Sequence, residues 1–404
     1  MSYKIVRITG LYNEYVQQYK AAFPGIINSG SYQEQYDHLI HNSFDTASSI
    51  SNQFRKMGVD ATDIFANVPW IQSRWKLENN SNKSGSELLF EQLRFYKPNV
   101  VWIDNLSLID DRWVNYVKTN IPSIKIVTGL VCAPYSSADV KTLKQFNFVA
   151  TCTPCLNKEI EKNGMRSFLI YHGFDAHILE LINKQNSYPD TDLLFTGSLY
   201  TGGGYHKSRI EYLEEFLKAK IPIKIYGKID PTSKVLTKMG AYYAINMLKN
   251  IGAKSLVKYI PLLNRYESFG DTPIQFYSRT LKASLVEPVY GIDQFKLLSK
   301  AKICFNIHGE IAQKCAGNLR LFEATGVGTC LVTDWKDNLS ALFEIDKEII
   351  AYKSKEECID KIKWLLDNPI KAAEIAKAGQ ARVLRDHTIE NRTTQLDEII
   401  KSNL

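Results

Sequence analysis

Short apolar runs alternate with segments of helical periodicity along most of the chain, and this alternation constrains the fold more than any other feature. Runs of this length are typical of buried strands, and strands separated by helices predict βαβ units with parallel pairing. One long helix is expected over Gln33–Met57. The expected strands form two series, at 4–9, 99–104, 125–130, 147–152 and 166–173, and then at 192–198, 221–228, 302–309 and 329–334. The sequence therefore predicts an α/β protein with two doubly wound parallel-sheet domains.

A polar segment, NKQNSYPD at 183–190, separates the two series. The length of 404 residues also fits two domains of about 200 residues, each able to bury its own core. The predicted organisation is a first domain at 1–175, a linker at 176–191, a second domain at 192–387 with an insertion or lid at 231–286, and a closing helix at 388–404. Because ligands bind at the carboxyl ends of strands in open parallel sheets, we expect a cleft between the domains.

Composition excludes several classes of protein. Hydrophobic residues make up 45% and charged residues 23% of the chain, which is typical of globular proteins and not of disordered or fibrous ones. The net charge of +7 is mild and no nucleic-acid-binding motif is present, so no nucleic acid is expected as a partner. No apolar run approaches the ~18 residues of a spanning helix and the start MSYKIVRITG does not resemble a signal peptide. These features predict a cytoplasmic protein whose membrane contact, if any, is peripheral.

The seven cysteines are scattered, and Cys152 and Cys155 form the one close pair, C-T-P-C. No second pair and no histidine at ligand spacing accompanies them, so the sequence predicts no metal site. We expect reduced, mostly buried thiols.

Two loops after expected strands carry residues suited to binding an anion. The first is FTGSLYTGGGYHKSR at 195–209, in which glycines allow close backbone approach and His206, Lys207 and Arg209 add donors and charge at a helix start. It matches neither a Walker loop nor G-x-G-x-x-G. The alternative is a glycine turn with solvated basic residues.

The second loop lies within NIHGEIAQKCAGNLRLFEATGVGT at 306–329. An expected strand ends near His308, and Asn318 is a good N-cap for the helix that follows. The first backbone N–H groups of that helix and the guanidinium of Arg320 would bind a phosphate. Glu323 lies between apolar residues, where its carboxylate needs a partner, and a sugar diol would supply two hydroxyl donors. The alternative is a surface ion pair of Arg320 with Glu323 at i,i+3 spacing.

Residues 289–309, 316–344 and 378–392, with FTGSLY at 195–200 and HGFD at 172–175, resemble the CgeB-like glycosyltransferases. The resemblance covers more than half of the chain, whereas the first ~150 residues match only in layout. It implies a GT-B fold, in which two Rossmann-like domains face a central cleft. It also implies a nucleotide-sugar donor in the second domain, an acceptor in the first, and a closing helix that returns to the first domain.

The resemblance also implies roles for single residues. Glu323 matches the acid that holds the nucleotide ribose, and Arg320 belongs to the family's pattern. The other implied donor-site residues are Gly197, Ser198, Lys207, Arg209, Gly317, Asn318 and Leu319, and His308, at the end of an expected strand, is a further candidate for this site. The sequence departs from many retaining enzymes of this fold at Cys315, eight residues before Glu323, where those enzymes carry a second acid. Either that acid is missing or Glu310 replaces it, so the stereochemical outcome stays open.

Sugar transfer requires stabilisation of the leaving diphosphate and, for inversion, a base for the acceptor hydroxyl. Arg209 and Arg320 are expected to stabilise the leaving group without a metal or other cofactor. The candidate bases are Asp104, at a strand end, and His38, His41 and Asp139. His172 lies at the domain junction, where a hinge role is the alternative to chemistry.

The predicted function is a metal-independent glycosyltransferase of bacterial surface polysaccharide or other glycan assembly, with a glycan or lipid-linked acceptor. Aromatic pairs in the insertion, Tyr242–Tyr243 and Phe276–Tyr277, would stack on sugars or touch the inner face of a membrane, or else pack locally. The alternatives are a nucleotide-sugar epimerase of the same fold and a catalytically inactive GT-B-like binding protein. The sequence makes no prediction of oligomeric state.

Overall fold

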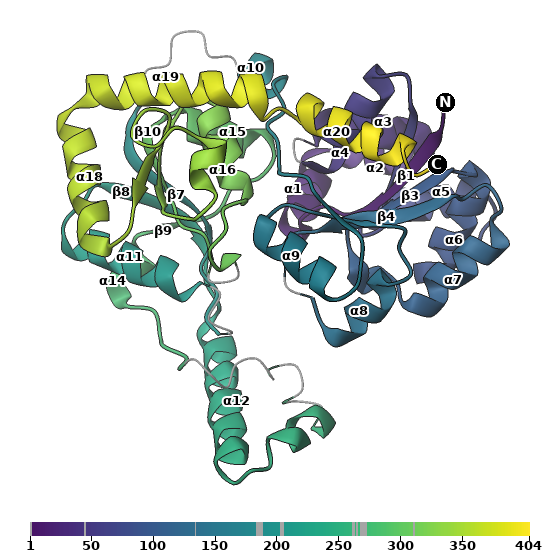
Figure 1. The fold of residues 1–404 in the computed structure, drawn as a ribbon, viewed down its shortest axis with the longest axis horizontal. Coiled ribbons are helices and arrows are strands. Elements are labelled where there is room, and N and C mark those ends of the chain that lie inside the picture. The colour runs from purple at the N-terminus through teal and green to yellow at the C-terminus, as the bar shows by residue number, and fades with distance from the viewer. Residues whose placement is uncertain are drawn as a thin grey trace.

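The protein forms two α/β domains, each built on a six-stranded parallel sheet (Figure 1). The computed structural model describes residues 2–404 except 44–45, 134, 183–188, 203–205, 261–262, 264–265, 267–272 and 310–311. The prediction of two doubly wound parallel-sheet domains is confirmed.

The first sheet has the strand order β2-β1-β3-β4-β5-β6. Its strands are β1 (Lys4–Thr9), β2 (Asp60–Phe65), β3 (Val100–Ile103), β4 (Ile126–Val131), β5 (Val149–Thr151) and β6 (Ser167–Leu169). Alternate residues of β1 face opposite sides of the sheet, so Val6 and Ile8 join one buried cluster and Ile5 joins another. The helices of this domain are α1 (Asn13–Ala22), α2 (Pro24–Ser29), α3 (Tyr32–Asn42), α4 (Thr46–Lys56), α5 (Pro69–Glu78), α6 (Gly85–Tyr96), η1 (Leu106–Leu108), α7 (Asp111–Asn120), α8 (Ser137–Leu143) and α9 (Pro154–Lys162).

The second sheet has the order β9-β8-β7-β10-β11-β12, so the direction of winding reverses between β7 and β10. Its strands are β7 (Thr191–Ser198), β8 (Ile223–Lys228), β9 (Leu285–Val286), β10 (Ala301–Asn306), β11 (Cys330–Asp334) and β12 (Ile350–Tyr352). The remaining helices are α10 (Ile178–Leu181), α11 (Lys207–Lys218), α12 (Thr232–Asn250), η2 (Lys254–Tyr259), α14 (Arg279–Ala283), α15 (Ile292–Ser299), α16 (Leu319–Gly326), α17 (Leu339–Leu342), α18 (Lys355–Asp367), α19 (Pro369–Asp386) and α20 (Ile389–Lys401). Such a reversal is the usual ligand-binding point of a doubly wound sheet.

The chain passes between the domains twice, and the two passages pair with each other. Phe174 donates its N–H to the carbonyl of His387 at 2.9 Å, and its own carbonyl accepts from the N–H of Ile389 at 3.0 Å. Beyond this pairing α20 packs on the first domain, where Leu396 and Ile400 join the cluster beneath the sheet. The C-terminal helix therefore closes the N-terminal domain (Figure 1).

An arm consisting of α12, η2 and the residues that connect them projects from the second domain (Figure 1). The arm falls within the insertion predicted at 231–286, and its helix α12 extends over 19 residues. At the base of the arm Lys238 forms a buried ion pair with Asp230, and Tyr277 donates its hydroxyl to the carbonyl of Leu199 at 2.7 Å. These contacts anchor the arm in the domain.

Within the described residues, no helix has both the length and the apolarity needed to cross a membrane.

Two local predictions for the first domain are wrong. The single helix expected over 33–57 is two helices, α3 and α4. The edge strand β2 was not expected, because its sequence, DATDIF, carries acidic residues in a buried element. The structure explains the second error, since the buried carboxylate of Asp63 accepts a hydrogen bond from Ser51 at 2.6 Å and pairs with Arg7 at 3.4 Å.

A disulfide between Cys155 and Cys315 joins the two domains, so the expectation of reduced thiols is wrong for this pair. Cys155 lies in the first turn of α9, and Cys315 precedes α16. Their Cα atoms are 5.8 Å apart although 160 residues separate them in sequence. Sequence spacing carries no signal for such a pair, because only the packing of one domain on the other brings the thiols together.

We predict that this disulfide stabilises the chain. Cross-linking residues so far apart removes loop entropy from the unfolded state, so reduction should lower the free energy of unfolding by about 2–4 kcal/mol. Denaturant unfolding with and without a reductant measures this difference. The Cys155→Ser/Cys315→Ser double variant should not respond to the reductant, and an unresponsive wild-type protein would contradict the prediction.

Candidate functional site

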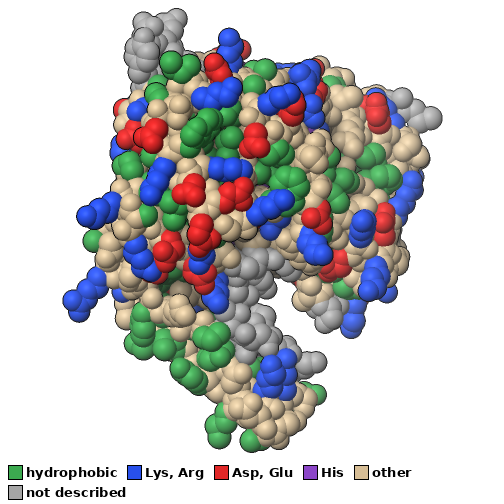
Figure 2. Space-filling model, turned by 60° about the vertical axis from the view of Figure 1, so that its left-hand side comes forward, with side chains coloured by type: hydrophobic (Ala, Val, Ile, Leu, Met, Phe, Trp, Pro, Cys, Tyr) green, Lys and Arg blue, Asp and Glu red, His purple; other side chains and the backbone are tan. Residues whose placement is uncertain are grey.

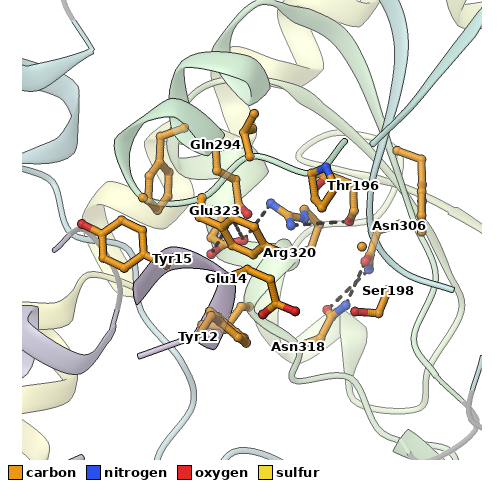
Figure 3. Close-up of a pocket in the computed structure, with 18 of the residues that line it drawn as sticks. Tyr12, Glu14, Tyr15, Thr196, Ser198, Gln294, Asn306, Asn318, Arg320 and Glu323 are labelled. Atoms are coloured by element: carbon orange, nitrogen blue, oxygen red, sulfur yellow. Dashed lines mark hydrogen bonds and ion pairs between the residues drawn. The ribbon is translucent and has the colours of Figure 1, made fainter. Parts of the chain in front are cut away.

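A cleft of about 490 Å³ lies between the two domains, beside the strand reversal of the second sheet. The second domain contributes the ends of β7, β8 and β10, the start of α16 and residues near α15, whereas the first contributes α1 and the residue before it (Figure 3). The residues predicted for a donor site that line this cleft are Gly197, Ser198, Arg209, Asn318, Leu319, Arg320 and Glu323. The structure thus brings together residues from sequence regions more than a hundred positions apart.

Arg320 and Glu323 form an ion pair of 2.8 Å inside the cleft, and each side chain is only 14% exposed. The i,i+3 pair that was the alternative to ligand binding therefore exists, but it lines the cleft and does not lie on the outer surface (Figure 3). Gln294 donates to the Glu323 carboxylate at 3.4 Å, and Arg320 donates to the carbonyl of Thr196 at 3.5 Å. Both charged groups are therefore oriented by neighbours from other elements.

The N-terminus of α16 opens toward the same cleft, because Asn318 and Leu319 line it. Asn318 is the N-cap residue, as predicted, but its side chain does not cap the helix. Its amide instead donates to Asn306 at 2.8 Å, and Asn306 donates to Thr333 at 2.9 Å. The partial positive charge of the helix terminus thus adds to that of Arg320 on one side of the cleft.

Two further cations border the cleft. Arg209 donates from its guanidinium to the carbonyls of Ser198 and Ile307, both at 3.3 Å, which holds it beside the end of β7. Lys228, at the end of β8, forms an ion pair across the cleft with Glu14 of α1. The hydrogen bond from Lys228 lowers the pKa of Glu14 below its ordinary value.

Sequence reasoning missed the residues that the first domain and the β8 end bring to the cleft. Tyr12 and Tyr290 approach each other from the two domains with ring centroids 6.1 Å apart, beside the pair of Glu14 and Lys228. The sequence did offer a signal for these residues other than Tyr290, because they lie at or just after the ends of the strands predicted at 4–9 and 221–228. Residues at the carboxyl ends of parallel strands gather at one edge of the sheet, where ligands bind.

Three residues predicted for the donor site lie elsewhere. Lys207 is half exposed and pairs with Glu211, beside the base of the arm. The His308 side chain is fully buried, 2.7 Å from Asp334, and lines a separate shallow hollow. Gly317 packs on the first domain, where a Cβ would lie 2.3 Å from the carbonyl oxygen of Cys152, so only glycine fits this contact.

The position of the expected second acid is occupied by the disulfide. Cys315 is 7% exposed and bonded to Cys155, so it offers no carboxylate-like group to a ligand. The proposed replacement, Glu310, lies outside the described residues.

A second cavity, of about 330 Å³, adjoins the cleft on the side of the first domain and shares Tyr12, Gly173 and Ile389 with it. Asp104 lines this cavity at the end of β3. Its carboxylate accepts hydrogen bonds from Arg7 at 2.8 Å and from the Trp102 indole at 2.5 Å. Among the predicted bases, Asp104 is the one that the structure places in a cavity adjoining the cleft.

The other predicted bases lie in structural contacts. The His38 ring packs on Phe23 with centroids 4.7 Å apart, and its Nδ1 contacts the Tyr19 hydroxyl. His41 is exposed near the end of α3. Asp139 belongs to the capping box of α8, where its carboxylate accepts from Ser136 at 2.7 Å.

Residues 246–398 match a family model described as Glycosyl transferase-like. The match includes most of the second domain, with Asn318, Arg320 and Glu323, and extends into α20. No curated protein sequence gives a significant match.

Solved structures with the same architecture cover the whole chain at low sequence identity. A glycosyltransferase from Rickettsia africae superposes with a TM-score of 0.55 at 11% identity, covering 100% of this chain and 98% of that one. The Anabaena protein HepE in complex with UDP-glucose gives 0.57 at 11% identity, covering 99% and 100%. Sucrose-phosphate synthase from Thermosynechococcus elongatus gives 0.53 at 10%, covering 99% and 98%. The predicted GT-B fold is therefore confirmed.

Proposed function

We propose that this protein is a glycosyltransferase that moves a sugar from a nucleoside-diphosphate donor to an acceptor hydroxyl. The observation that carries the proposal is the pair of Arg320 and Glu323 at the start of α16, inside the cleft and at the strand reversal. An arginine at a helix N-terminus suits a diphosphate, and a nearby carboxylate suits a ribose diol. The family match over these residues supports the same function.

In the proposed complex the donor diphosphate binds between the N-terminus of α16 and the turn after β7 at Gly197–Ser198. Glu323 accepts hydrogen bonds from the ribose, while Arg320 turns from Glu323 toward phosphate. The leaving diphosphate gains negative charge as the sugar–phosphate bond breaks, and Arg209, Arg320 and Lys228, which line the cleft, stabilise that charge. We propose that this step needs no metal ion, because the cations of the chain supply the charge.

The acceptor is proposed to bind in the second cavity, which adjoins the donor cleft. Asp104 is then the candidate base for its hydroxyl, because its carboxylate faces that cavity. The hydrogen bonds from Arg7 and Trp102 hold the carboxylate in place at the edge of the cavity, where it can accept a proton from a bound hydroxyl.

The projecting arm supports a proposal of peripheral membrane contact. Leu236, Tyr243, Met247 and Ile251 lie on one side of α12 and are each 55–69% exposed. Hydrophobic side chains gather on this arm (Figure 2). Residues 231–266 contain no acidic side chain, whereas lysines are frequent there. An apolar stripe with excess positive charge suits an anionic lipid surface, and a lipid-linked acceptor at the inner face of a bacterial membrane would meet the enzyme there.

We predict that Glu323→Gln and Arg320→Ala each weaken nucleotide binding by about 10–100-fold, the loss expected for a hydrogen bond to a charged group. Thermal shift and titration calorimetry with UDP, GDP and ADP measure the effect. Glu374→Gln, which removes an exposed carboxylate paired with Lys371, is the matched control and should change nothing.

Because Arg320 and Glu323 are paired, each single variant also leaves the other charge without its partner. The double variant should therefore lose less than the sum of the two single losses. Absence of stabilisation by any nucleoside diphosphate would contradict the donor site, and binding without turnover would indicate a binding protein. Interconversion of two nucleotide sugars would indicate an epimerase.

We predict that Asp104→Asn lowers kcat by about 100-fold or more while donor affinity stays unchanged, because loss of a general base affects the chemical step alone. Release of the nucleoside diphosphate from the donor found in the binding screen measures kcat. Asp139→Asn, in the capping box, is the control and should keep kcat. A kcat unchanged in Asp104→Asn would remove Asp104 from the mechanism.

We predict that replacing Leu236, Tyr243, Met247 and Ile251 together by serine lowers the vesicle-bound fraction by about tenfold or more. Co-sedimentation with phosphatidylglycerol-containing vesicles measures binding, and phosphatidylcholine vesicles should bind less. Serine at Leu77 and Ile370, which are equally exposed on other helices, serves as the control. If the wild-type protein binds neither kind of vesicle, the proposed membrane contact of the arm is wrong.

A further inference from the structure

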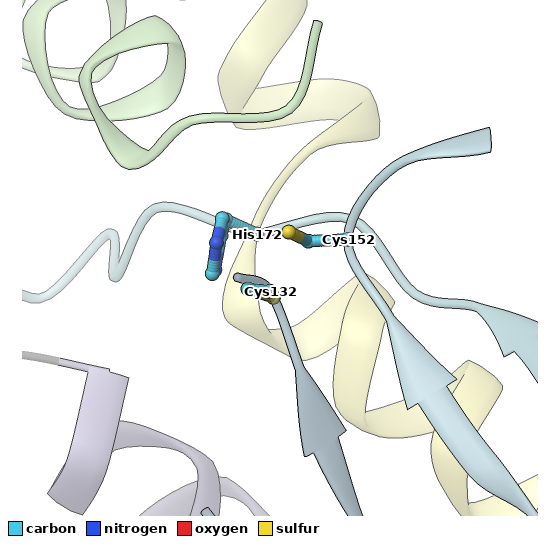
Figure 4. Close-up of side chains that lie close together, drawn as sticks. All are labelled: Cys132, Cys152 and His172. Atoms are coloured by element: carbon cyan, nitrogen blue, oxygen red, sulfur yellow. The ribbon is translucent and has the colours of Figure 1, made fainter. Parts of the chain in front are cut away.

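Three side chains of types that commonly bind metals lie together at the ends of neighbouring strands of the first sheet. Cys132 follows β4, Cys152 follows β5 and His172 comes three residues after β6. The three strands are adjacent, so their carboxyl ends bring the side chains to one point (Figure 4). The two thiol sulfurs and a ring nitrogen of His172 all lie within 4.8 Å of one another.

Two thiols and one imidazole are ligands that Zn²⁺ prefers. A Zn–S distance near 2.3 Å places two ligand sulfurs about 3.8 Å apart in a tetrahedron. The present spacing exceeds that value by about 1 Å at most, which small side-chain rotations can remove. The strand ends hold the backbone of two of the ligands, so the site is largely formed in the folded domain.

The charges around the cluster are compatible with a dication. Two thiolates neutralise Zn²⁺, and Asp104 adds a carboxylate at the end of the next strand, β3. Two cations lie nearby: Arg7 pairs with Asp104 at 2.8 Å, and Arg392 donates to the carbonyl oxygen of His172 at 3.1 Å and so fixes the backbone of one ligand. This contact uses the backbone of His172, and a ring nitrogen of the same residue lies within 4.8 Å of both sulfurs.

The cluster borders the second cavity. His172 and Asp104 line that cavity, and Cys132 is partly exposed, whereas Cys152 is buried. Three protein ligands beside an open cavity leave the fourth coordination position for water or a bound molecule, as in catalytic zinc sites.

We propose that Cys132, Cys152 and His172 bind one zinc ion, with its fourth position directed to the second cavity. The site lies outside the donor cleft, so the metal-independent departure of the diphosphate is unaffected, and its fourth position faces the cavity proposed for the acceptor. It does not rest on the glycosyltransferase function either. The sequence predicted no metal site because it offered only the close pair Cys152 and Cys155. The proposed ligands instead lie twenty residues apart, one after each of three successive strands.

The test is the zinc content of the full-length protein after incubation with excess Zn²⁺ under mild reduction and removal of free metal. We expect one zinc per chain in the wild-type protein and less than a tenth of that in Cys132→Ser and Cys152→Ser. His172→Ala should weaken the affinity at least tenfold. The matched control is Cys155→Ser/Cys315→Ser, which removes two other cysteines from the same domain interface and should retain one zinc.

Cobalt substitution gives a readout that does not require the variants to fold. Wild-type protein with Co²⁺ should show a sulfur-to-cobalt charge-transfer band and the intense visible bands of a tetrahedral site. A wild-type protein that binds no zinc, or a cobalt spectrum without the sulfur band, would overturn the proposal. Mass spectrometry can also detect a Cys132–Cys152 disulfide. If such a disulfide persists under the mild reduction used for zinc loading, the proposal is overturned and the pair is identified as a redox couple.

Discussion

The two backbone hydrogen bonds that pair the domain crossings determine how the sheets face each other. They join Phe174 to His387 and Ile389, so both passages of the chain are fixed at one place. Close packing reinforces the pairing, since a Cβ on Gly326 would lie 2.4 Å from the Phe174 ring and one on Gly173 would lie 2.8 Å from Thr388. Gly326 ends α16, whose N-terminus lines the cleft, so the crossing and the candidate donor site belong to one packed unit.

Two of the cations that line the cleft are paired with carboxylates. Arg320 pairs with Glu323, and Lys228 pairs with Glu14 of the other domain. The Arg320 and Glu323 side chains are largely buried, where a charge without a partner would be costly, so this pair stabilises the site. A nucleotide offers a phosphate group to Arg320 and hydroxyl groups to Glu323, so each residue would exchange its present partner for a group of the ligand. A ligand with only one of these groups would leave the other residue unpaired, which favours nucleotides over inorganic phosphate.

Sequence reasoning was most accurate where local signals define an element. The strand expected at 4–9 corresponds to β1, which spans the same residues. It failed for β2, whose buried Asp63 is acceptable only because Arg7 and Ser51 lie opposite. In the site it selected Arg320 and Glu323, which line the cleft. It also selected His308, whose side chain is buried against Asp334 and does not line the cleft.

The sequence by itself determined the two parallel-sheet domains and the residues at the start of α16, because hydrophobic periodicity, glycine turns and helix-capping residues act over short distances along the chain. Only the tertiary structure decided which strand ends meet. The Glu14–Lys228 pair, the Cys155–Cys315 disulfide and the Cys132–Cys152–His172 cluster all depend on that arrangement. Their members are separated by entire βα units or lie in different domains, so no local pattern relates them. Their proximity follows from parallel strands ending at one edge and from the packing of one domain against the other.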